Sequence, residues 1–287
     1  MIHIETSHLR LDLRPEEGAC VWSMDFLGDA GWQPVLVPDP GETEGALNSG
    51  LFWMLPFANR TRQNRLHAVQ IVPNTAEPLA LHGSAWSQSW NVETIRDGYV
   101  QLSLSCHQPE APFPFSAGLH VQIDGATFKA QLRLRNEATH IIPAGLGVHP
   151  YFPRLSRTTL QFEASHFYLE GPDHLPTVAI TLPPELDFAT GAPLPQTWRN
   201  NAYGGWQGNA LIRQPELGYE LLMQSQAGMR ELMLYTAPGL ARFALEPQSH
   251  TSGATLEDAP KPQVGLAVLQ PGQILSGEVA LTLSPMQ

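Results

Sequence analysis

Short segments in which apolar and polar residues alternate run through most of the chain. In 8–14 and 128–135 every second residue is apolar, a period of two that is typical of β-strands with one buried face. Segments of this kind recur at short spacing, and turn-forming Pro and Gly residues separate them. The strands expected on this basis are 8–14, 19–26, 51–58, 89–95, 99–106, 116–123, 127–136, 144–153, 159–164, 209–213, 220–224, 231–235, 242–245, 265–269 and 276–283.

Helical patterns are not among the expected elements, because no segment of three or more turns repeats its apolar residues every 3.6 positions. Residues 38–50 and 171–200 are rich in turn-forming residues and are expected to be irregular. No fixed-period repeat or low-complexity linker divides the chain. The pattern therefore predicts an all-β protein, a large antiparallel β-sandwich in which residues 1–287 form a single domain.

Charge and composition narrow the partners that such a domain could have. The formal net charge is −11, which disfavours nucleic acid and anionic membranes because both attract basic surfaces. The sequence has no run of ~18 apolar residues and no basic-then-apolar signal segment. Its two cysteines make neither a disulfide framework nor a clustered zinc site. We expect a cytoplasmic protein, a monomer or weak homodimer, with no nucleic-acid and no membrane partner.

The segment 144–153, AGLGVHPYFP, combines a strand pattern with reactive side chains. One face carries the residues expected in the core, Leu146, Val148, Pro150 and Phe152. The other face carries Gly145, Gly147, His149 and Tyr151. Glycine in a strand often marks the close approach of a ligand, and Pro150 is expected to end the strand or place it at an edge. His149 would then stand over an open floor, although a structural histidine held by a hydrogen bond fits the pattern equally well.

Two other segments place polar residues directly beside apolar ones. Asn59 and Arg60 end the apolar run 51–58, and the donor fork of a guanidinium suits sugar hydroxyls or carboxylates. His82 precedes a glycine and, four residues on, Trp86, a combination that suits a sugar site. A surface arginine and a structural histidine are the alternatives, and these residues alone do not decide between them.

Glu246 follows the apolar segment 242–245, and Pro247 is expected to stop the strand there. A buried carboxylate is costly unless it is partnered, and desolvation raises its pKa towards the range of a general base. A carboxylate that caps a turn is the alternative. Asn200 and Trp206 lie in a segment whose amides and aromatic rings suit carbohydrate, or else in an ordinary loop.

Motifs for several other chemistries are missing from the sequence. It contains no phosphate-binding loop, dinucleotide glycine fingerprint, metalloprotease helix or serine nucleophile elbow. The histidines are spread along the chain and not set at metal-ligand spacings. We therefore expect neither a metal nor a cofactor.

Taken together, these segments resemble the aldose 1-epimerase (galactose mutarotase-like) family, in a less-characterised bacterial branch. The matching pieces occur in the family's order and reach across nearly the whole chain: 56–60, 81–83 with Trp86 and Trp90, 147–152, 245–247 and 269–272. The resemblance implies a β-supersandwich, which agrees with the strand pattern.

The activity implied by the resemblance is the interconversion of α and β anomers of a free aldose through ring opening, without a cofactor. It makes Glu246 the general base for the C1 hydroxyl and His149 the general acid for the ring oxygen. The monosaccharide is expected to be bound by Arg60, His82, Asn59, Asn200, Tyr151 and Trp206. Gly145 and Gly147 are expected to be needed because side chains there would intrude on the sugar or on its neighbours, so that Gly147→Val impairs activity more than folding.

One departure from the family means that the identity of the sugar cannot be inferred from the resemblance. Many members have an aspartate in the later sugar-binding segment, where this chain has Asn200, and an amide binds hydroxyls without carrying charge. A hexose-6-phosphate 1-epimerase, with Arg62 and Arg65 as phosphate ligands, is a second reading. A non-catalytic carbohydrate-binding protein is the third.

Overall fold

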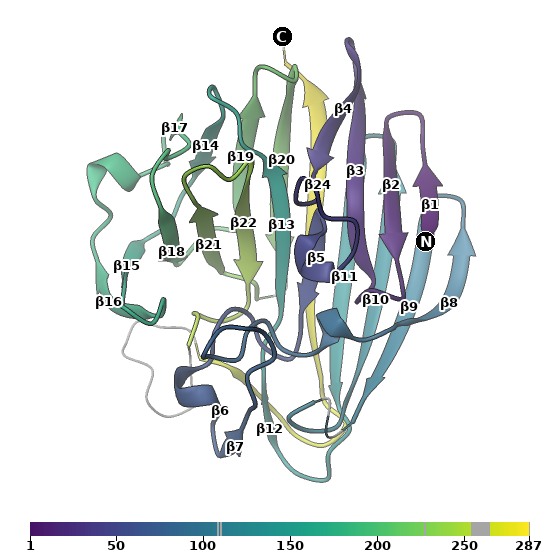
Figure 1. The fold of residues 1–287 in the computed structure, drawn as a ribbon, viewed down its shortest axis with the longest axis vertical. Coiled ribbons are helices and arrows are strands. Elements are labelled where there is room, and N and C mark those ends of the chain that lie inside the picture. Colours follow the sequence, from purple (N-terminus) through teal and green to yellow (C-terminus); the bar gives the residue numbers. More distant parts are fainter. Residues whose placement is uncertain (108, 110, 227, 254–264, 287) are drawn as a thin grey trace.

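The computed structural model describes residues 1–107, 109, 111–226, 228–253 and 265–286. Two large antiparallel β-sheets are stacked on each other (Figure 1), which confirms the predicted all-β sandwich. The helices of the described residues are 3₁₀ turns of three residues, Ala46–Asn48, Arg62–Asn64, Ala85–Ser87 and Pro184–Leu186. None of these is long enough to cross a membrane.

The front sheet, nearer the viewer in Figure 1, has 11 strands within the described residues. Its order is β1 (Ile2–Glu5), β2 (Leu9–Arg14), β3 (Cys20–Gly28), β5 (Leu51–Met54), β13 (Gly147–Pro153), β22 (Arg242–Gln248), β21 (Glu231–Thr236), β18 (Arg199–Gly204), β15 (His166–Glu170) and β16 (Pro176–Ile180). The remaining strand, β4 (Gly31–Leu36), pairs with β3. Segments far apart in the sequence therefore meet at the centre, where β5, β13 and β22 are neighbours.

The back sheet has nine strands within the same residues. Its order is β17 (Ala192–Pro193), β14 (Thr159–Phe162), β19 (Asn209–Gln214), β20 (Tyr219–Gln226), β24 (Ile274–Pro285), β11 (Thr127–Asn136), β10 (Phe115–Asp124), β9 (Tyr99–Cys106) and β8 (Asn91–Arg96). Two short ladders lie outside the sheets: β12 (Ile142–Ala144) with β23 (Ala267–Leu269), and β6 (Arg65–Leu66) with β7 (Val69–Gln70).

Alternation along the strands builds the core between the sheets. Leu9, Leu11 and Leu13 of β2 and Leu132 and Leu134 of β11 are all buried in one continuous hydrophobic cluster. Their polar neighbours point away from it, as a period of two requires. Strands β9 and β11 have the bounds that the pattern predicts.

The sequence pattern missed strands where alternation is weak. Strands β16 and β17 lie within 171–200, which was predicted to be irregular, and β18 begins in that range at Arg199. Strand β18 pairs with β21 and β15. Between its ends it carries Asn200, Asn201, Ala202 and Tyr203, so its sequence does not show the alternating apolar residues by which a strand is recognised.

The two prolines expected to stop strands do not stop them. Strand β13 runs through Pro150 to Pro153, and β22 runs through Pro247 to Gln248. Gly147 pairs with Gln248 and Tyr151 with Ala244, while no pairing joins the residues between them. The register of these pairs places His149 opposite Glu246, Pro150 opposite Leu245 and Pro247 opposite Val148. Because proline has no N–H to donate, Pro150 and Pro247 interrupt the ladder on either side of His149 and Glu246. Each strand stays held by its other neighbour, β5 or β21.

The face assignment within the segment 144–153 is confirmed. Leu146, Val148 and Phe152 join the core between the sheets. On the outer face of the front sheet, a second small cluster lies beneath Tyr151, formed by Cys20, Ala46, Phe52, Met54 and Ala58. The central strands are therefore buried on both faces, as the burial of all four β5 residues shows.

The two glycines of this segment are packed closely against neighbouring side chains. A Cβ at Gly147 would lie 2.5 Å from Cε of Met54 and 2.8 Å from Cβ of Ala58. A Cβ at Gly145 would lie 2.1 Å from the ring of His250. Side chains at these positions would thus collide with neighbouring protein groups, so the glycines permit close packing beneath the outer face.

Gly147→Ala should therefore lower the free energy of unfolding, by about 1–3 kcal/mol, since the added methyl overpacks a closed cluster. Gly118→Ala in β10 is the matched control, because a Cβ there meets nothing within 4 Å. That control should be neutral or slightly stabilising. Urea denaturation of both variants measures the difference, and equal stability of the two would refute the packing role.

Candidate active site

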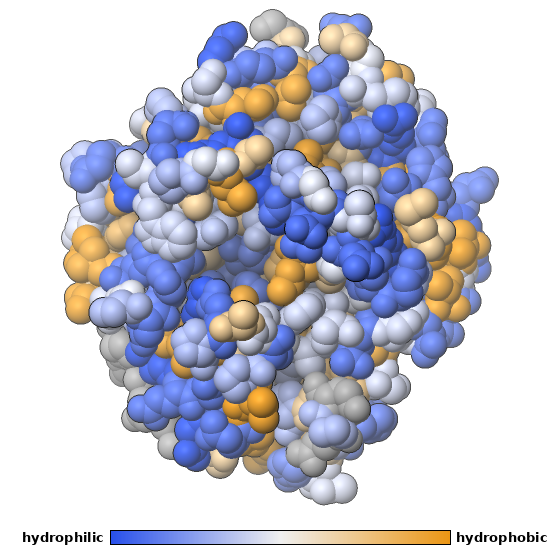
Figure 2. All heavy atoms as spheres, in the orientation of Figure 1, coloured by the Kyte–Doolittle hydropathy of each residue, from blue (hydrophilic) through white to orange (hydrophobic). Residues whose placement is uncertain are grey.

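A cavity of about 220 Å³ opens on the outer face of the front sheet, over β13, β22 and β21. Figure 2 shows this face hollowed near its middle, with mainly hydrophilic side chains around the hollow. The volume is below the usual range for drug-sized ligands and suits a smaller molecule. Its lining residues are Asn59, Arg60, Glu77, Leu81, His82, His149, Tyr151, His174, Trp198, Asn200, Tyr235 and Glu246.

His149 and Glu246 lie opposite each other across the gap between β13 and β22. Nε2 of His149 is 3.3 Å from Oε1 of Glu246, and both residues are almost fully buried. The imidazole stacks on the ring of Phe52 with centroids 4.5 Å apart. The unpaired stretch of the ladder thus brings a carboxyl group and an imidazole together on a rigid apolar support.

Burial moves the two pKa values in opposite directions. Desolvation raises the pKa of Glu246 to about 8, against the lowering effects of a hydrogen bond from Gln248 and the charge of Arg60. Desolvation also lowers the pKa of His149 to about 3, with a further lowering effect of Arg242. Near neutral pH the pair therefore holds one proton between its two groups, which makes it a proton donor and a proton acceptor in a single site.

Gln248 fixes the orientation of the Glu246 carboxyl group. Its side-chain amide donates a hydrogen bond of 3.0 Å to Oε2 of Glu246. Both side chains leave the same face of β22, since they are two residues apart. With Oε2 held in this way, Oε1 is the oxygen that faces His149.

His82 is placed by an unusual backbone. Its φ of 58° and that of Asn59, 56°, both lie in the left-handed region, and the two residues hold each other. The backbone N–H of Asn59 donates to Nδ1 of His82, and the N–H of His82 donates to the carbonyl of Asn59. Nδ1 is thus an acceptor, so a neutral His82 carries its proton on Nε2. Burial lowers the pKa of His82 well below its usual value, which keeps it neutral.

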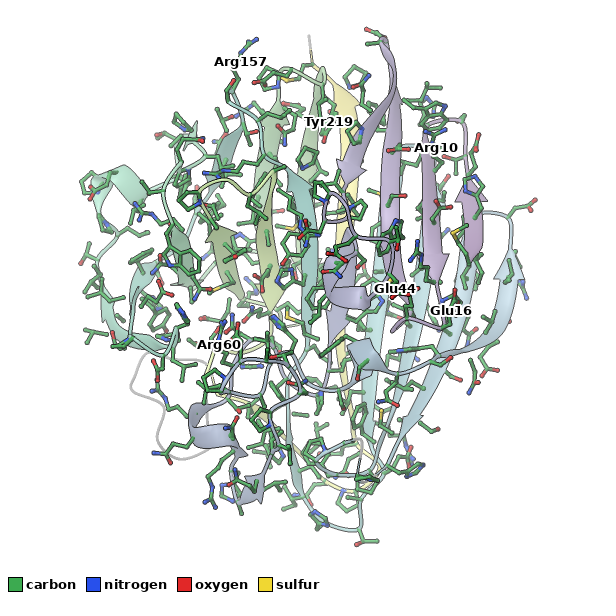
Figure 3. The ribbon with its side chains drawn as sticks, in the orientation of Figure 1. Arg10, Glu16, Glu44, Arg60, Arg157 and Tyr219 are labelled. Carbon is green, nitrogen blue, oxygen red and sulfur yellow. The ribbon has the colours of Figure 1, made fainter. Side chains whose placement is uncertain are left out.

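Arg60 enters the cavity wall from the loop after β5 (Figure 3). Its guanidinium makes two hydrogen bonds to the carboxylate of Glu77, Nε to Oε2 at 2.6 Å and Nη2 to Oε1 at 2.5 Å. Nη1 has only a 3.5 Å contact with Oδ1 of Asn59. Two donors are therefore committed to Glu77, and the Nη1 side of the fork is the side left for a ligand.

Tyr151 lies on the floor of the cavity beside His149, with ring centroids 4.6 Å apart. The guanidinium of Arg242 lies 3.7 Å from the centre of the Tyr151 ring and pairs with Asp39 at 3.0 Å. Burial raises the pKa of the Tyr151 hydroxyl, which keeps it a neutral donor. Arg242 does not line the cavity, and it contacts the Tyr151 ring from outside the cavity.

Asn200 lines the opposite wall and is tied to a carboxylate. Its amide donates to Oε1 of Glu170 at 2.8 Å, and the same carboxylate accepts from Trp198 Nε1 at 2.9 Å. His174 Nδ1 lies 2.6 Å from Glu170 Oε1. Trp198 also packs edge-on against Tyr235, with centroids 5.6 Å apart. Glu170 thus organises an aromatic and amide wall from behind.

Trp206 is not part of this site. Its side chain is fully buried in the core between the sheets, and its Nε1 donates to the carbonyl of Asn209. The expectation that it binds sugar is therefore wrong, because its ring is buried in the core and does not line this cavity. Trp198, 40% exposed, is the tryptophan of this segment that lines the cavity.

The structure brings together seven of the eight expected residues: His149, Glu246, Arg60, His82, Asn59, Asn200 and Tyr151. Sequence reasoning missed Glu77, His174 and Tyr235. Glu77 lies in a segment without strand pattern, and His174 lies at the start of the proline-rich stretch 171–200, so neither carries a periodic signal. Tyr235 was recognisable only as a strand residue.

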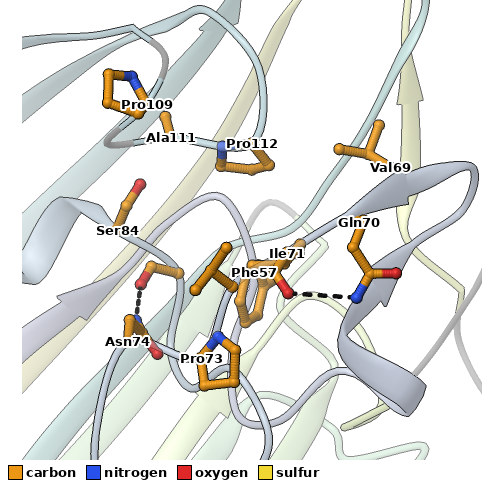
Figure 4. Close-up of a pocket in the computed structure, with 12 residues that line it drawn as sticks. Phe57, Val69, Gln70, Ile71, Pro73, Asn74, Ser84, Pro109, Ala111 and Pro112 are labelled. Carbon is orange, nitrogen blue, oxygen red and sulfur yellow. Dashed lines mark hydrogen bonds between the residues drawn. The ribbon is translucent and has the colours of Figure 1, made fainter.

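A larger cavity of about 450 Å³ lies elsewhere, under the loops around 69–74 and 109–112 (Figure 4). Phe57, Val69, Ile71, Pro73 and Pro112 form much of its wall. None of its described lining residues is ionisable, so proton-transfer chemistry belongs to the smaller cavity. Across the described residues, no group of three or more His, Cys, Asp or Glu side chains is placed to hold a metal ion.

Known proteins with related sequences and structures identify the family and the fold. The family model described as aldose 1-epimerase matches residues 2–282. The uncharacterized protein YphB of Escherichia coli K12 is 32% identical over 257 residues, covering 84% of this chain and 87% of the relative. The crystal structure of a candidate aldose 1-epimerase from Escherichia coli K12 has a TM-score of 0.89 and 28% identity, covering 99% of this chain and 98% of the other.

More distant structures share the fold. The galactose 1-epimerase of Lactobacillus acidophilus has a TM-score of 0.78 at 13% identity, with 99% of this chain and 94% of the other covered. The family model matches almost the whole chain, and this match assigns the chain to its family. This chain belongs to the aldose 1-epimerase family.

Proposed function

We propose that the protein is an aldose 1-epimerase that interconverts the α and β anomers of a free monosaccharide. The observation that carries the proposal is the buried pair of His149 and Glu246, whose facing atoms are 3.3 Å apart in a cavity of about 220 Å³. Ring opening of an aldose needs one group to take a proton from the C1 hydroxyl and another to give one to the ring oxygen. The pair supplies both.

Because the pKa values place the resting proton on Glu246, the proposed reaction begins when this proton passes to His149 across their 3.3 Å contact. Glu246, now a carboxylate, accepts the proton of the C1 hydroxyl while His149 donates its proton to the ring oxygen. The bond between C1 and that oxygen breaks, and the open aldehyde turns about the bond between C1 and C2. The two transfers then run in reverse and close the ring on the other face. The pair ends with the single proton with which it began, so no net proton is exchanged with water.

The neighbouring groups suit the binding of a sugar. Nη1 of Arg60 and Nε2 of His82 are donors on one side, and the Tyr151 hydroxyl lies at the floor. Asn200 and Trp198 supply an amide and an aromatic face on the opposite wall, the combination that suits hydroxyls and sugar C–H groups.

The reading as a hexose-6-phosphate 1-epimerase lacks its expected cations. Arg62 donates to the carbonyl of Pro176, and Arg65 makes only a 3.5 Å contact with a backbone carbonyl. Neither residue lines the cavity. A binding protein without catalysis would have no use for a buried carboxyl group facing an imidazole, because burying both groups is costly.

Replacing Glu246 by Gln should lower kcat by about 10²–10⁴-fold, since it removes the base and keeps the shape of the side chain. Anomer exchange of freshly dissolved α-galactose and α-glucose, followed by NMR or polarimetry, measures the effect. Glu231→Gln is a matched control, because Glu231 is also a buried carboxyl group, on the neighbouring strand, but lies outside the cavity. Undiminished activity of Glu246→Gln would exclude the proposed mechanism.

The pH profile should reflect the raised pKa of Glu246. Above about pH 8 the pair loses its only proton, so kcat/KM should fall about tenfold per pH unit on the alkaline side. No fall is expected from pH 7 down to pH 5, because the pKa of His149 is lowered to about 3. Rates from pH 5 to 9.5, corrected for spontaneous mutarotation, provide the measurement. An acidic fall centred near the usual histidine pKa would contradict the assignment.

Gln248→Met tests whether the hydrogen bond from Gln248 to Oε2 of Glu246 affects the pKa of that carboxyl group. The hydrogen bond to Oε2 favours the charged form of Glu246, so its loss should raise the pKa of Glu246 and move the alkaline fall to higher pH. A fall that moves to lower pH, or that does not move, would show that the amide does not act on this carboxyl group.

A further inference from the structure

Glu77 is the feature of the cavity that the proposed mechanism does not use. It comes from the loop before His82, lines the cavity, and keeps 38% of its side chain exposed. Its carboxylate makes two hydrogen bonds to the guanidinium of Arg60, which is itself only 13% exposed. Such a paired, planar contact fixes the guanidinium and compensates its charge.

The charges of the cavity cancel because of this contact. Among the described lining residues, Arg60 is the only group with a permanent positive charge, and Glu77 balances it. His149 and Glu246 share one proton, so together they add no net charge near neutral pH. His82 is held neutral by burial. A ligand with a negative group would therefore meet the Glu77 carboxylate and find no free cation.

We propose that Glu77 determines substrate class by cancelling the charge of Arg60, so that the cavity selects electrically neutral aldoses over aldoses bearing a carboxylate or phosphate. This inference rests on the proposed function, since it concerns the sugar bound in the same cavity. It predicts that the preference for neutral over anionic aldoses is due to the Glu77 carboxylate alone. Removing the charge of Glu77 should then allow Arg60 to bind an anion.

The test compares the binding of D-galactose and D-galacturonate, which differ in charge at C6, by ligand-observed NMR titration. Glu77→Gln keeps the size of the side chain and removes its charge. The galacturonate-to-galactose affinity ratio should rise about tenfold, the order expected for an uncompensated unit charge a few ångströms from an anion. The gain should shrink in high salt, because screening weakens exposed charges. D-glucose 6-phosphate, paired with D-glucose, repeats the comparison with a phosphate.

Two variants separate charge from geometry. Glu77→Asp keeps the charge while shortening the side chain, and it should leave the ratio within about twofold of the wild type. Glu137→Gln removes an equal charge from another arginine pair, with Arg135 in the back sheet, and should also leave the ratio unchanged. These controls exclude a geometric effect and a general effect of net charge.

The inference is overturned if Glu77→Gln does not change the ratio, if Glu77→Asp changes it equally, or if the wild type already prefers galacturonate. Anomer exchange measured on the same samples tests the proposed function separately. Binding of galactose without exchange would reject the epimerase and still allow the affinity ratio to decide the role of Glu77. Binding of none of the four sugars, galactose, glucose and their two charged counterparts, would reject both.

Discussion

The site depends on one costly arrangement, a carboxyl group and an imidazole buried together with their facing atoms 3.3 Å apart. Each charged form alone would lose its hydration, and the protein would have to offset that cost with partners or keep the group neutral. Sharing a single proton reduces the cost, because the pair has no net charge in either of its one-proton forms. The same arrangement would provide the donor and the acceptor for the proposed ring opening, so one shared proton serves both the burial of the pair and the proposed catalysis.

This arrangement depends on a gap in the backbone pairing between β13 and β22. Regular hydrogen bonding between β13 and β22 would require donors where Pro150 and Pro247 have none. The pairing on both sides of the gap keeps His149 opposite Glu246, and the outer neighbours β5 and β21 hold each strand in place. Stacking of the imidazole on Phe52 fixes the ring from below. The reactive groups therefore lie on rigid strands and not on loops, which favours precise positioning.

Periodicity in the sequence predicted the architecture because alternating burial is a local property. Strands such as β9 and β11 show it along their full length, and their bounds followed directly. The same reasoning misjudged Pro150 and Pro247, since a proline inside a sheet requires a local gap that only the paired strand reveals. It also placed Trp206 in the sugar site when its ring fills the core. An aromatic residue beside glycines looks alike in either setting, and only the tertiary packing separates them.

Two carboxylates, Glu77 and Glu170, contact wall residues that are distant from them in the sequence, and the sequence pattern did not predict these contacts. Glu77 and Arg60 are 17 residues apart, and Glu170 reaches Asn200 from another strand, so neither contact has a pattern along the chain. Both carboxylates act on groups of the wall by accepting their hydrogen bonds: one takes up the charge of an arginine, and the other orients an amide and an indole. A wall that is polar yet electrically balanced can bind hydroxyls in several orientations without holding any one of them strongly. Such binding suits the proposed reaction, because its open-chain aldehyde must rotate about the C1–C2 bond before the ring closes.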